Sequence, residues 1–227
     1  PTKQALLGHI PHAMIVDAFS SSEAVGMGQS VSASGVDPET ATFKLGEHTK
    51  VFTEDLREVE PGSGEIGKVA VGGYQPIGDY KDTEKTAATF LTVEGKRYSV
   101  PGDFATVEAD GTITLLGRGS VSINTGGEKV FAEEVEEVLK LHGTVRDAVA
   151  VGVPDDKFGE AITAVVELAP ETDLDELGII DHVKGKLAHY KAPKRVVAID
   201  TIGRAPNGKV DYKRLKQYAK DELGITE

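Results

Sequence analysis

The side chains that could act on a phosphate group fall in two short stretches of the chain. Ser21, Ser22 and Glu23 are consecutive. Two hydroxyls followed by a carboxylate suit phosphate oxygens and a magnesium ion, because Mg²⁺ takes one or two carboxylates together with substrate phosphates. Arg118 is the only large side chain in the turn Gly117–Gly119, where its guanidinium could hold an anion as a charged fork. By itself, however, a Ser-rich turn is most often an ordinary loop.

Two further residues stand at turns where a reactive group would be accessible. Asp103 ends a predicted strand at a Gly-Asp corner, and a carboxylate there can accept both hydrogens of a vicinal diol. Lys209 lies in the stretch 204–211, where Pro206 and Gly208 predict a projecting loop. A Gly-Asp turn is common and an exposed loop lysine is usually only solvated, so residue type alone leaves both interpretations open.

The stretch 117–139 would position some of these groups. After Arg118 a short alternating run leads to Gly126 and Gly127, which predict a tight hairpin. From Ala132 the apolar residues recur at helical spacing, and acids early in a helix suit its positive end. These acids are expected to cover the faces away from the core: Glu133, Glu134, Glu136 and Glu137. The whole stretch would form a phosphate-facing hinge, although a surface hairpin followed by an ordinary amphipathic helix fits equally well.

The N-terminal half predicts short strands broken by turns. The apolar run 13–16 predicts a buried strand that ends at the serine turn. Residues 42–116 alternate between strand patterns and turns, with a helix start at 79–86. Asp110 and Gly111 predict the turn of a hairpin between two strands.

The C-terminal half predicts a small α+β domain with helices packed against a sheet. Its apolar runs are typical of buried strands, and a turn at Pro154 separates the first two. The predicted strands are 145–153, 160–168 and 196–199, and the predicted helices are 177–187 and 212–223. We place a domain boundary at Ser120, so that residues 1–119 and 120–227 form separate domains.

Composition indicates a folded protein and argues against several classes. The 227 residues are 39% hydrophobic and 27% charged, which is typical of globular proteins. No apolar run is long enough for a membrane span. The chain has no cysteine, which excludes disulfides and thiolate metal sites and suits a cytoplasmic enzyme.

Charge is distributed unevenly along the chain. The net charge is −12, yet residues 181–227 contain 11 Lys and Arg against 6 Asp and Glu. An acidic body argues against a nucleic-acid binder, whereas a basic last segment suits contact with a polyanionic small molecule such as ATP or coenzyme A. A solvated, Lys-rich terminal helix would account for part of this excess.

Four motifs occur in the order that is found in the adenylate-forming superfamily, which comprises acyl-CoA synthetases, peptide-synthetase adenylation domains and luciferases. They are residues 17–23 (DAFSSSE), 101–103 (PGD), 117–139 and 206–209 (PNGK). The chain resembles the C-terminal part of these enzymes, because the expected upstream phosphate loop is not in the sequence. The resemblance implies an α+β fold: the end of the large N-terminal domain, with short strands in a distorted barrel, followed by a small α+β lid.

The resemblance assigns nucleotide contacts to the N-terminal half by position in these motifs. Phe19 would stack on adenine, Ser22 would contact a phosphate, and Ser21 would line the same turn. Glu23 would hold Mg²⁺. Asp103 would accept hydrogen bonds from the ribose hydroxyls.

In the C-terminal half the resemblance implies a moving lid. Lys209 would be the catalytic residue, bridging the acyl carboxylate and the α-phosphate. Arg118 would hold ribose or phosphate, and Ser120 would be the hinge, although relatives usually have Asp or Lys there. After the lid rotates, Gly126 and Gly127 would line the channel for the pantetheine arm of coenzyme A.

Three other positions in these motifs bear on the assignment. Lys129 would lie near the phosphate in the second step, since its position is often basic in relatives. Ser20 stands where relatives usually have glycine, which bears on the geometry of the serine turn. Asn124 stands where many members carry a lysine used in the second step, so that role is not transferred.

The implied activity is that of an AMP-forming acyl-CoA ligase. A carboxylic acid and ATP would give an acyl-adenylate and pyrophosphate, and the thiol of CoA would then displace AMP. ATP and CoA would be co-substrates, with Mg²⁺ as the metal ion. A small-molecule carboxylic acid is the expected partner, nucleic acid is not, and a homodimer is left open.

The identity of the acid and the thiol is less constrained. The stretch 118–131 is most similar to fatty-acid-CoA ligases of actinobacterial type, some of which take steroid side-chain acids. Only 18 residues follow Lys209, which favours a stand-alone CoA ligase. The alternatives are an adenylation module that loads a carrier protein and a non-catalytic relative. We expect residues 1–227 alone to have no ligase activity.

Overall fold

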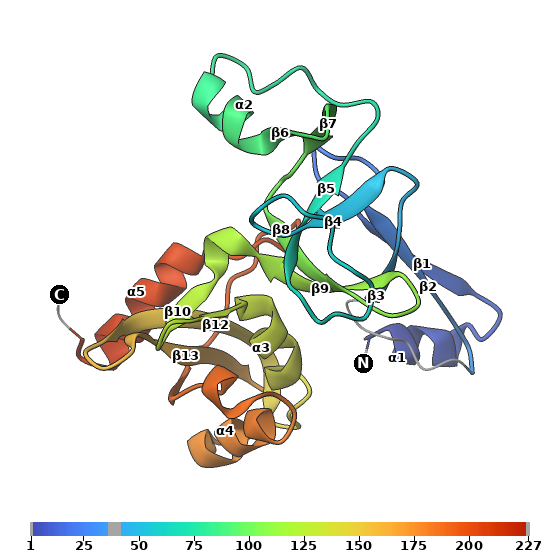
Figure 1. The fold of residues 1–227 in the computed structure, drawn as a ribbon. Helices are drawn as coiled ribbons and strands as arrows, with labels where there is room; N and C mark the ends of the chain where they lie inside the picture. Colours follow the sequence, from blue (N-terminus) through green and yellow to red (C-terminus); the bar gives the residue numbers. More distant parts are fainter. Residues whose placement is uncertain (1, 36–41, 226–227) are drawn as a thin grey trace. The chain divides into compact units, whose positions relative to one another are not determined.

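The computed structural model describes residues 2–35 and 42–225, and Figure 1 shows how their helices and strands follow one another. The chain divides into two units, residues 1–116 and residues 117–227. Each unit has its own sheet and its own apolar core, so each is described by itself. The interpretation of the two parts as a substrate-binding domain and a lid stays a prediction.

The described strands of the N-terminal unit form one nine-stranded sheet in the order β1-β2-β3-β9-β8-β5-β7-β6, with β4 paired to β5. The strands are β1 (Met14–Phe19), β2 (Gly28–Ala33), β3 (Thr42–Leu45), β4 (Thr49–Phe52), β5 (Gly67–Val71), β6 (Phe90–Val93), β7 (Lys96–Ser99), β8 (Asp103–Val107) and β9 (Thr112–Arg118). The helices are α1 (Thr2–His9) and α2 (Thr83–Thr89). The predicted series of short strands is confirmed, as is the helix start, where the Asp82 side chain caps α2.

The core of the N-terminal unit lies on both faces of β5. Val69 and Val71 belong to the larger apolar cluster, together with Met27 and Ile113. Ala70 points the other way, into a smaller cluster in which the rings of Phe52 and Tyr98 meet edge to face at 5.0 Å. Strand β5 is therefore covered on both sides, which explains its nearly continuous apolar sequence.

Strand β1 departs from the prediction for its burial. A strand forms there, but Met14 is 73% exposed and Val16 is 58% exposed. Val16 pairs with Val31 of β2, which is also 56% exposed. The reason is topological, because β1 is the edge of the sheet and only Phe19 at its end packs against the larger cluster. The predicted burial of this strand was therefore wrong.

The C-terminal unit contains a five-stranded sheet in the order β11-β10-β13-β12, with β14 paired to β13. The strands are β10 (Ile123–Thr125), β11 (Glu128–Val130), β12 (Val145–Asp155), β13 (Gly159–Leu168) and β14 (Arg195–Ala198). The α-helices are α3 (Ala132–Leu139), α4 (Glu176–Lys184) and α5 (Tyr212–Glu222), and the short 3₁₀ turns are η1 (Gly119–Val121) and η2 (His189–Lys191). The predicted strands and helices of this half are confirmed, with shifts of a few residues at their ends.

Helices cover both faces of this sheet (Figure 1). Along β12, Ala148 and Ala150 belong to the cluster packed with α3 and α4, whereas Val149 and Val151 belong to the cluster packed with α5. Side chains alternate between the faces of a strand, so a strand that is buried on both faces has a continuous apolar sequence. The run at 145–153 reflects this three-layer arrangement.

One acid of α3 is not on the solvent side as predicted. Glu136 is only 4% exposed and lies on the same side of the helix as Val135 and Leu139. Its carboxylate accepts a hydrogen bond from the backbone N–H of Ala150 on β12 at 3.1 Å. The Glu136 side chain on the helix thus provides a hydrogen-bond acceptor for a backbone N–H of the strand. The periodicity of the sequence alone cannot distinguish such a buried acid from one that faces solvent.

Candidate active site

The serine turn joins β1 to β2 and is held by its own backbone. Ser21 N donates to Ala24 O at 2.9 Å, and Ala24 N donates back to Ser21 O at 3.3 Å. Ser20 Oγ accepts the N–H of Gly26 at 3.1 Å. The serine that replaces the usual glycine of the motif therefore stabilises this turn.

The hydroxyls and the carboxylate of this turn differ in their surroundings. Ser21 Oγ is buried and has no hydrogen-bond partner among the described residues, whereas Ser22 is exposed. The Glu23 carboxylate lies 3.8 Å from the ammonium of Lys85, which also pairs with Asp79. Glu23 thus already lies beside a cation.

The N-terminal unit could bind a magnesium ion only if a substrate supplied some of the metal ligands. No group of three His, Asp or Glu side chains that could hold a metal occurs in the part of the chain that the structure describes. Glu23 would supply one carboxylate, and Mg²⁺ commonly takes its other ligands from phosphates and water. The unpaired hydroxyl of Ser21 is a buried polar atom that a phosphate oxygen would satisfy.

Phe19 is half-buried, whereas Asp103 is buried. The Phe19 ring lies 5.7 Å from the ring of Phe43 at a tilt of 41° and packs against the larger apolar cluster. Asp103 is 6% exposed and begins β8, rather than ending a strand as predicted. Gly102 directly before it has φ of +97°, a conformation that glycine adopts without strain. The corner therefore places the carboxylate at the start of a buried strand.

In the C-terminal unit, Gly117 allows the turn to contact α3. A Cβ at Gly117, where φ is +131°, would lie 2.2 Å from Glu133 Oε2. Because that space is free, the Glu133 carboxylate can accept the backbone N–H of Arg118 at 3.3 Å. Gly117 is thus required because the Glu133 carboxylate lies close to its Cα. The backbone of the exposed Arg118 is bonded to the first turn of α3.

Ser120, the predicted hinge, lies exposed in the 3₁₀ turn η1. Ser122 closes this turn twice, since its N–H and its hydroxyl donate to Gly119 O at 3.3 and 2.8 Å. A cavity of about 390 Å³ adjoins the turn and is lined by Ser120, Val121, Ser122, Ile123, Ala150, Val151, Gly152, Glu160, Tyr212, Lys213 and Lys216. The role of Ser122 in holding the turn was not predicted from the sequence.

The predicted glycine hairpin joins β10 to β11. Gly126 and Gly127 have φ of +61° and +88°, as expected of a tight turn with both central residues in the left-handed region. Gly126 N donates to Phe158 O at 2.9 Å, whereas nothing lies within 4 Å of a Cβ placed at Gly127. Lys129 is exposed, and its ammonium lies 5.8 Å from the centre of the Phe131 ring.

Lys209 follows a tight turn between Ala205 and Gly208. Gly208 N donates to Ala205 O at 2.8 Å, and Ala205 N donates to Lys209 O at 2.9 Å. Asn207 Oδ1 accepts the N–H of Lys209 at 3.2 Å. The lysine side chain is exposed and its ammonium makes no ion pair with any described residue. The predicted projecting loop is therefore confirmed.

A buried contact that the sequence does not reveal connects α3 to the start of α5. Tyr212 donates its hydroxyl to Glu136 at 3.0 Å. Burial raises the pKa of Glu136 to about 7, although the bonds from Ala150 N and Tyr212 act in the opposite direction. Burial and the Glu136 charge raise the pKa of Tyr212 above its usual value. These partners are 76 residues apart, so no local pattern could indicate the pair.

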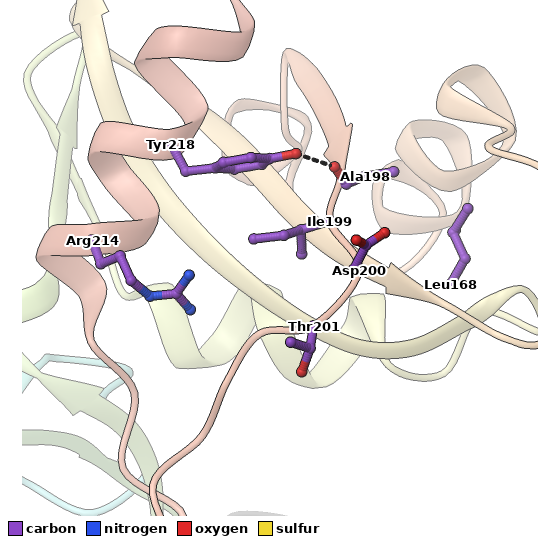
Figure 2. A pocket seen from close by; sticks show the side chains of 7 residues that line it. All are labelled: Leu168, Ala198, Ile199, Asp200, Thr201, Arg214 and Tyr218. Atoms are coloured by element: carbon purple, nitrogen blue, oxygen red, sulfur yellow. Dashed lines mark hydrogen bonds between the residues drawn. The ribbon is translucent and has the colours of Figure 1, made fainter.

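A further cavity of the C-terminal unit, about 640 Å³, is lined by none of the predicted site residues. Figure 2 shows its lining, which consists of Leu168, Ala198, Ile199, Asp200, Thr201, Arg214 and Tyr218. The Tyr218 hydroxyl donates to Ala198 O at 2.6 Å, and Arg214 donates to Ile202 O. The Tyr218 hydroxyl and the Arg214 guanidinium are thus already bonded within the fold.

Residues 134–209 match the family model described as the AMP-binding enzyme C-terminal domain. The chain is 48% identical over 229 residues to a 3-oxocholest-4-en-26-oate–CoA ligase of Rhodococcus rhodochrous, covering 98% of this chain and 40% of that protein. It is 45% identical to a medium/long-chain-fatty-acid–CoA/3-oxocholest-4-en-26-oate–CoA ligase of Mycobacterium tuberculosis, covering 95% of this chain and 39% of that protein.

Solved structures show the same fold. The ATP-bound MatB of Rhodopseudomonas palustris matches with a TM-score of 0.74 and 25% identity, over 92% of this chain and 41% of that one. The anthranilate CoA ligase AuaEII in complex with anthranoyl-AMP matches with a TM-score of 0.75 and 26% identity, over 92% and 40%. The chain thus spans about 40% of the length of these proteins. Within the described residues, none of the helices could cross a membrane.

Proposed function

We propose that this chain is the C-terminal part of an AMP-forming acid–CoA ligase of the adenylate-forming superfamily. The observation that carries the proposal is the 48% identity, over 98% of the chain, to a relative named as a CoA ligase. The second relative, at 45% identity, is named for the same reaction type with two classes of acid. The α+β fold and the order of the four motifs support the same assignment.

The proposed reaction has two steps. A carboxylate attacks the α-phosphate of ATP, so that pyrophosphate leaves and an acyl-adenylate forms. The thiolate of CoA then attacks the acyl carbon, and AMP leaves. Because the first step brings two anions together, positive charge at the transition state should dominate its catalysis.

In the N-terminal unit, Asp103 would accept hydrogen bonds from the ribose hydroxyls and Phe19 would lie against adenine. Ser21 and Ser22 would contact phosphate oxygens, an assignment supported by the unpaired hydroxyl of Ser21. Glu23 would hold Mg²⁺, which when bound supplies positive charge to the phosphates. The ammonium of Lys85, 3.8 Å from Glu23, is consistent with a cation-binding carboxylate.

In the C-terminal unit, Lys209 would supply the mobile positive charge of the first step. Its exposed ammonium, which has no ion pair among the described residues, is available for such a role. Arg118 would hold ribose or phosphate, and Ser120 would be the pivot of a lid rotation. Gly127, with open space around it, could then approach the pantetheine arm without a side-chain clash.

We propose a medium- or long-chain fatty acid or a steroid side-chain acid as the acyl substrate, because the two relatives are named for these acids. The test is to incubate the purified full-length protein with ATP, Mg²⁺ and a panel of such acids, and to follow ATP–pyrophosphate exchange with and without CoA. Exchange together with CoA-dependent AMP release supports the ligase. Exchange without any turnover of CoA would instead favour a carrier-loading module, and no exchange with any acid would contradict the proposal.

A further inference from the structure

The loop that carries Lys209 begins at a bidentate ion pair. Arg204 Nε lies 2.7 Å from Asp147 Oδ2, and Arg204 Nη2 lies 2.9 Å from Asp147 Oδ1. Two parallel N–H···O bonds of this kind fix the orientation of the guanidinium as well as its position. The pair joins the loop to β12, which lies 57 residues earlier in the chain.

The third nitrogen of the same guanidinium extends to the far end of the loop. Arg204 Nη1 donates to Gly208 O at 3.3 Å. That carbonyl belongs to the peptide unit whose nitrogen is the backbone N of Lys209. One side chain thus connects a strand carboxylate to the peptide bond directly before the lysine.

The carboxylate end of this connection lies on a paired strand. Asp147 lies on the eleven-residue strand β12, opposite Glu167 of β13 in the antiparallel register. Its Oδ1 also accepts the N–H of Ala148 at 2.8 Å. Burial alone would raise the pKa of Asp147, but the bonds and charge of Arg204 hold it below its usual value. The pair therefore remains charged at neutral pH.

A neighbouring bond fixes the loop just before Arg204. The carboxylate of Glu167, which is 4% exposed, accepts the N–H of Ile202 at 3.0 Å. The loop is thus attached to adjacent positions of β12 and β13 on its N-terminal side. By contrast, the described structure gives the Lys209 side chain no partner that would hold it, so its aim depends on the backbone.

We propose that Asp147 and Arg204 are positioning residues that set the backbone from which Lys209 reaches the reacting phosphate. The inference rests on the proposed function, in which Lys209 acts in adenylate formation. A lysine is a point charge on a flexible four-carbon stem, so the position of its backbone limits where the charge can go. A displacement of about 1 Å far from the reacting atoms can cost on the order of 100-fold in rate.

The geometry predicts that lysine cannot replace Arg204. Three contacts lie in the plane of one guanidinium, and an ammonium on a lysine stem cannot make them together. Arg204→Lys keeps the charge and most of the bulk, so it tests the planar fork alone. Arg195 offers a matched control, because its Nε pairs with Glu176 Oε1 at 3.0 Å in the same unit but away from the loop.

The experiment compares the half-reactions of full-length Arg204→Lys, Asp147→Asn and Arg195→Lys. We expect the first two to lower the kcat of ATP–pyrophosphate exchange by roughly tenfold to 100-fold with little change in the KM for ATP. Thioester formation from pre-made acyl-adenylate and CoA should stay within about twofold. Arg195→Lys should leave both steps unchanged. Normal exchange in Arg204→Lys, or equal losses in both steps, would overturn the proposal.

A second measurement separates this proposal from the proposed function. Amide hydrogen exchange reports the bonds at Gly208 N and Lys209 N without any need for activity. We expect faster exchange at these two amides in Arg204→Lys and Asp147→Asn, but not in Arg195→Lys. If the wild-type protein activates no acid, the proposed function fails, and this measurement still decides the inference. Unchanged protection at both amides would overturn it.

Discussion

Two sets of carboxylates, one in each unit of the chain, are used in different ways. In the N-terminal unit, Lys50 pairs with Glu58 and Arg57 pairs with Glu65. These partners are eight residues apart, and their side chains are between 41% and 55% exposed. Such pairs join segments that are close in the sequence, and exposed pairs contribute little to stability.

In the C-terminal unit, two buried carboxylates and one half-buried carboxylate connect distant parts of the chain. Glu136 and Glu167 are each 4% exposed, and each accepts a backbone N–H from another element. Asp147 binds Arg204 over 57 residues, and Glu136 binds Tyr212 over 76. Each of the three carboxylates therefore holds together elements that are distant in the chain.

The difference indicates what the carboxylates of the C-terminal unit contribute. Burying a carboxylate costs desolvation free energy that its partners only partly offset, so these groups are poor candidates for stability alone. Asp147 and Glu167 bind the segment before Lys209, and Glu136 binds Tyr212 after it. The serine turn of the N-terminal unit is held by its own backbone and by the Ser20 hydroxyl. We infer that Asp147 and Glu167 contribute more to the position of the Lys209 loop than to the stability of the unit.

The largest expected effect tests whether that loop serves chemistry. Lys209→Ala in the full-length protein should lower adenylate formation by about 10²–10³-fold, the scale of one lost transition-state charge. Thioester formation from pre-made acyl-adenylate should change much less. ATP–pyrophosphate exchange and single-turnover thioester assays measure the two steps, with the exposed Lys186→Ala as control. Equal losses in both steps would mean that Lys209 is structural.

The next effect concerns the exposed turn at Ser120. Proline fixes φ near −65°, which the 3₁₀ turn η1 tolerates, so Ser120→Pro should hold the turn in one conformation. One half-reaction should continue while the other falls by about 100-fold, the scale of a misplaced catalytic group. Ser120→Asp, which keeps a flexible φ, should preserve both steps. Normal rates in both steps for the proline variant would place the pivot elsewhere.

The buried carboxyl of Glu136 should make stability depend on pH. Its pKa of about 7 in the folded protein lies above the ordinary value of 4.5, so folding favours the protonated form. Stability should therefore fall as pH rises from about 4.5 to 7, by about 3 kcal/mol in total. Glu136→Gln should remove this slope in urea unfolding followed from pH 5 to 8. The exposed neighbour variant Glu137→Gln should retain it, and equal slopes in both variants would contradict the assignment.

The smallest expected effect is at the surface pair of the N-terminal unit. Glu65→Gln removes one partner of Arg57, and both side chains are largely solvated. The urea midpoint should not shift measurably, because exposed ion pairs are screened and conformationally costly. A clear shift of the midpoint would show that this exposed carboxylate contributes to stability, against the contrast drawn above.

The sequence predicts most of the secondary structure because local patterns determine it. The apolar runs of β12 and β13, the glycine pair of the hairpin and the spacing in α3 all have a local cause. Burial was predicted less well. The edge position of β1 depends on which strands pair, and the burial of Glu136 depends on Ala150 and Tyr212. Neither is visible in a short window of sequence.

The same limit applies to the candidate site. Glycine, serine and lysine motifs indicate where a nucleotide could bind, and Gly117 and Gly208 are explained by their conformations. The groups that hold the Lys209 loop are missed because Asp147 looks like an ordinary charged residue within an apolar run. Its partner Arg204 lies 57 residues away, so only the fold brings the two together.

The exposed apolar edge at β1 has a consequence for handling the chain. Within the described part of the chain, Met14, Val16 and Val31 are exposed apolar side chains on the edge strand β1 and its neighbour β2. Edges of this kind add strands from other molecules, and a charge or proline on them normally prevents it. A purified preparation of these 227 residues should therefore aggregate as its concentration rises, through pairing at this edge. Val16→Lys should reduce this aggregation.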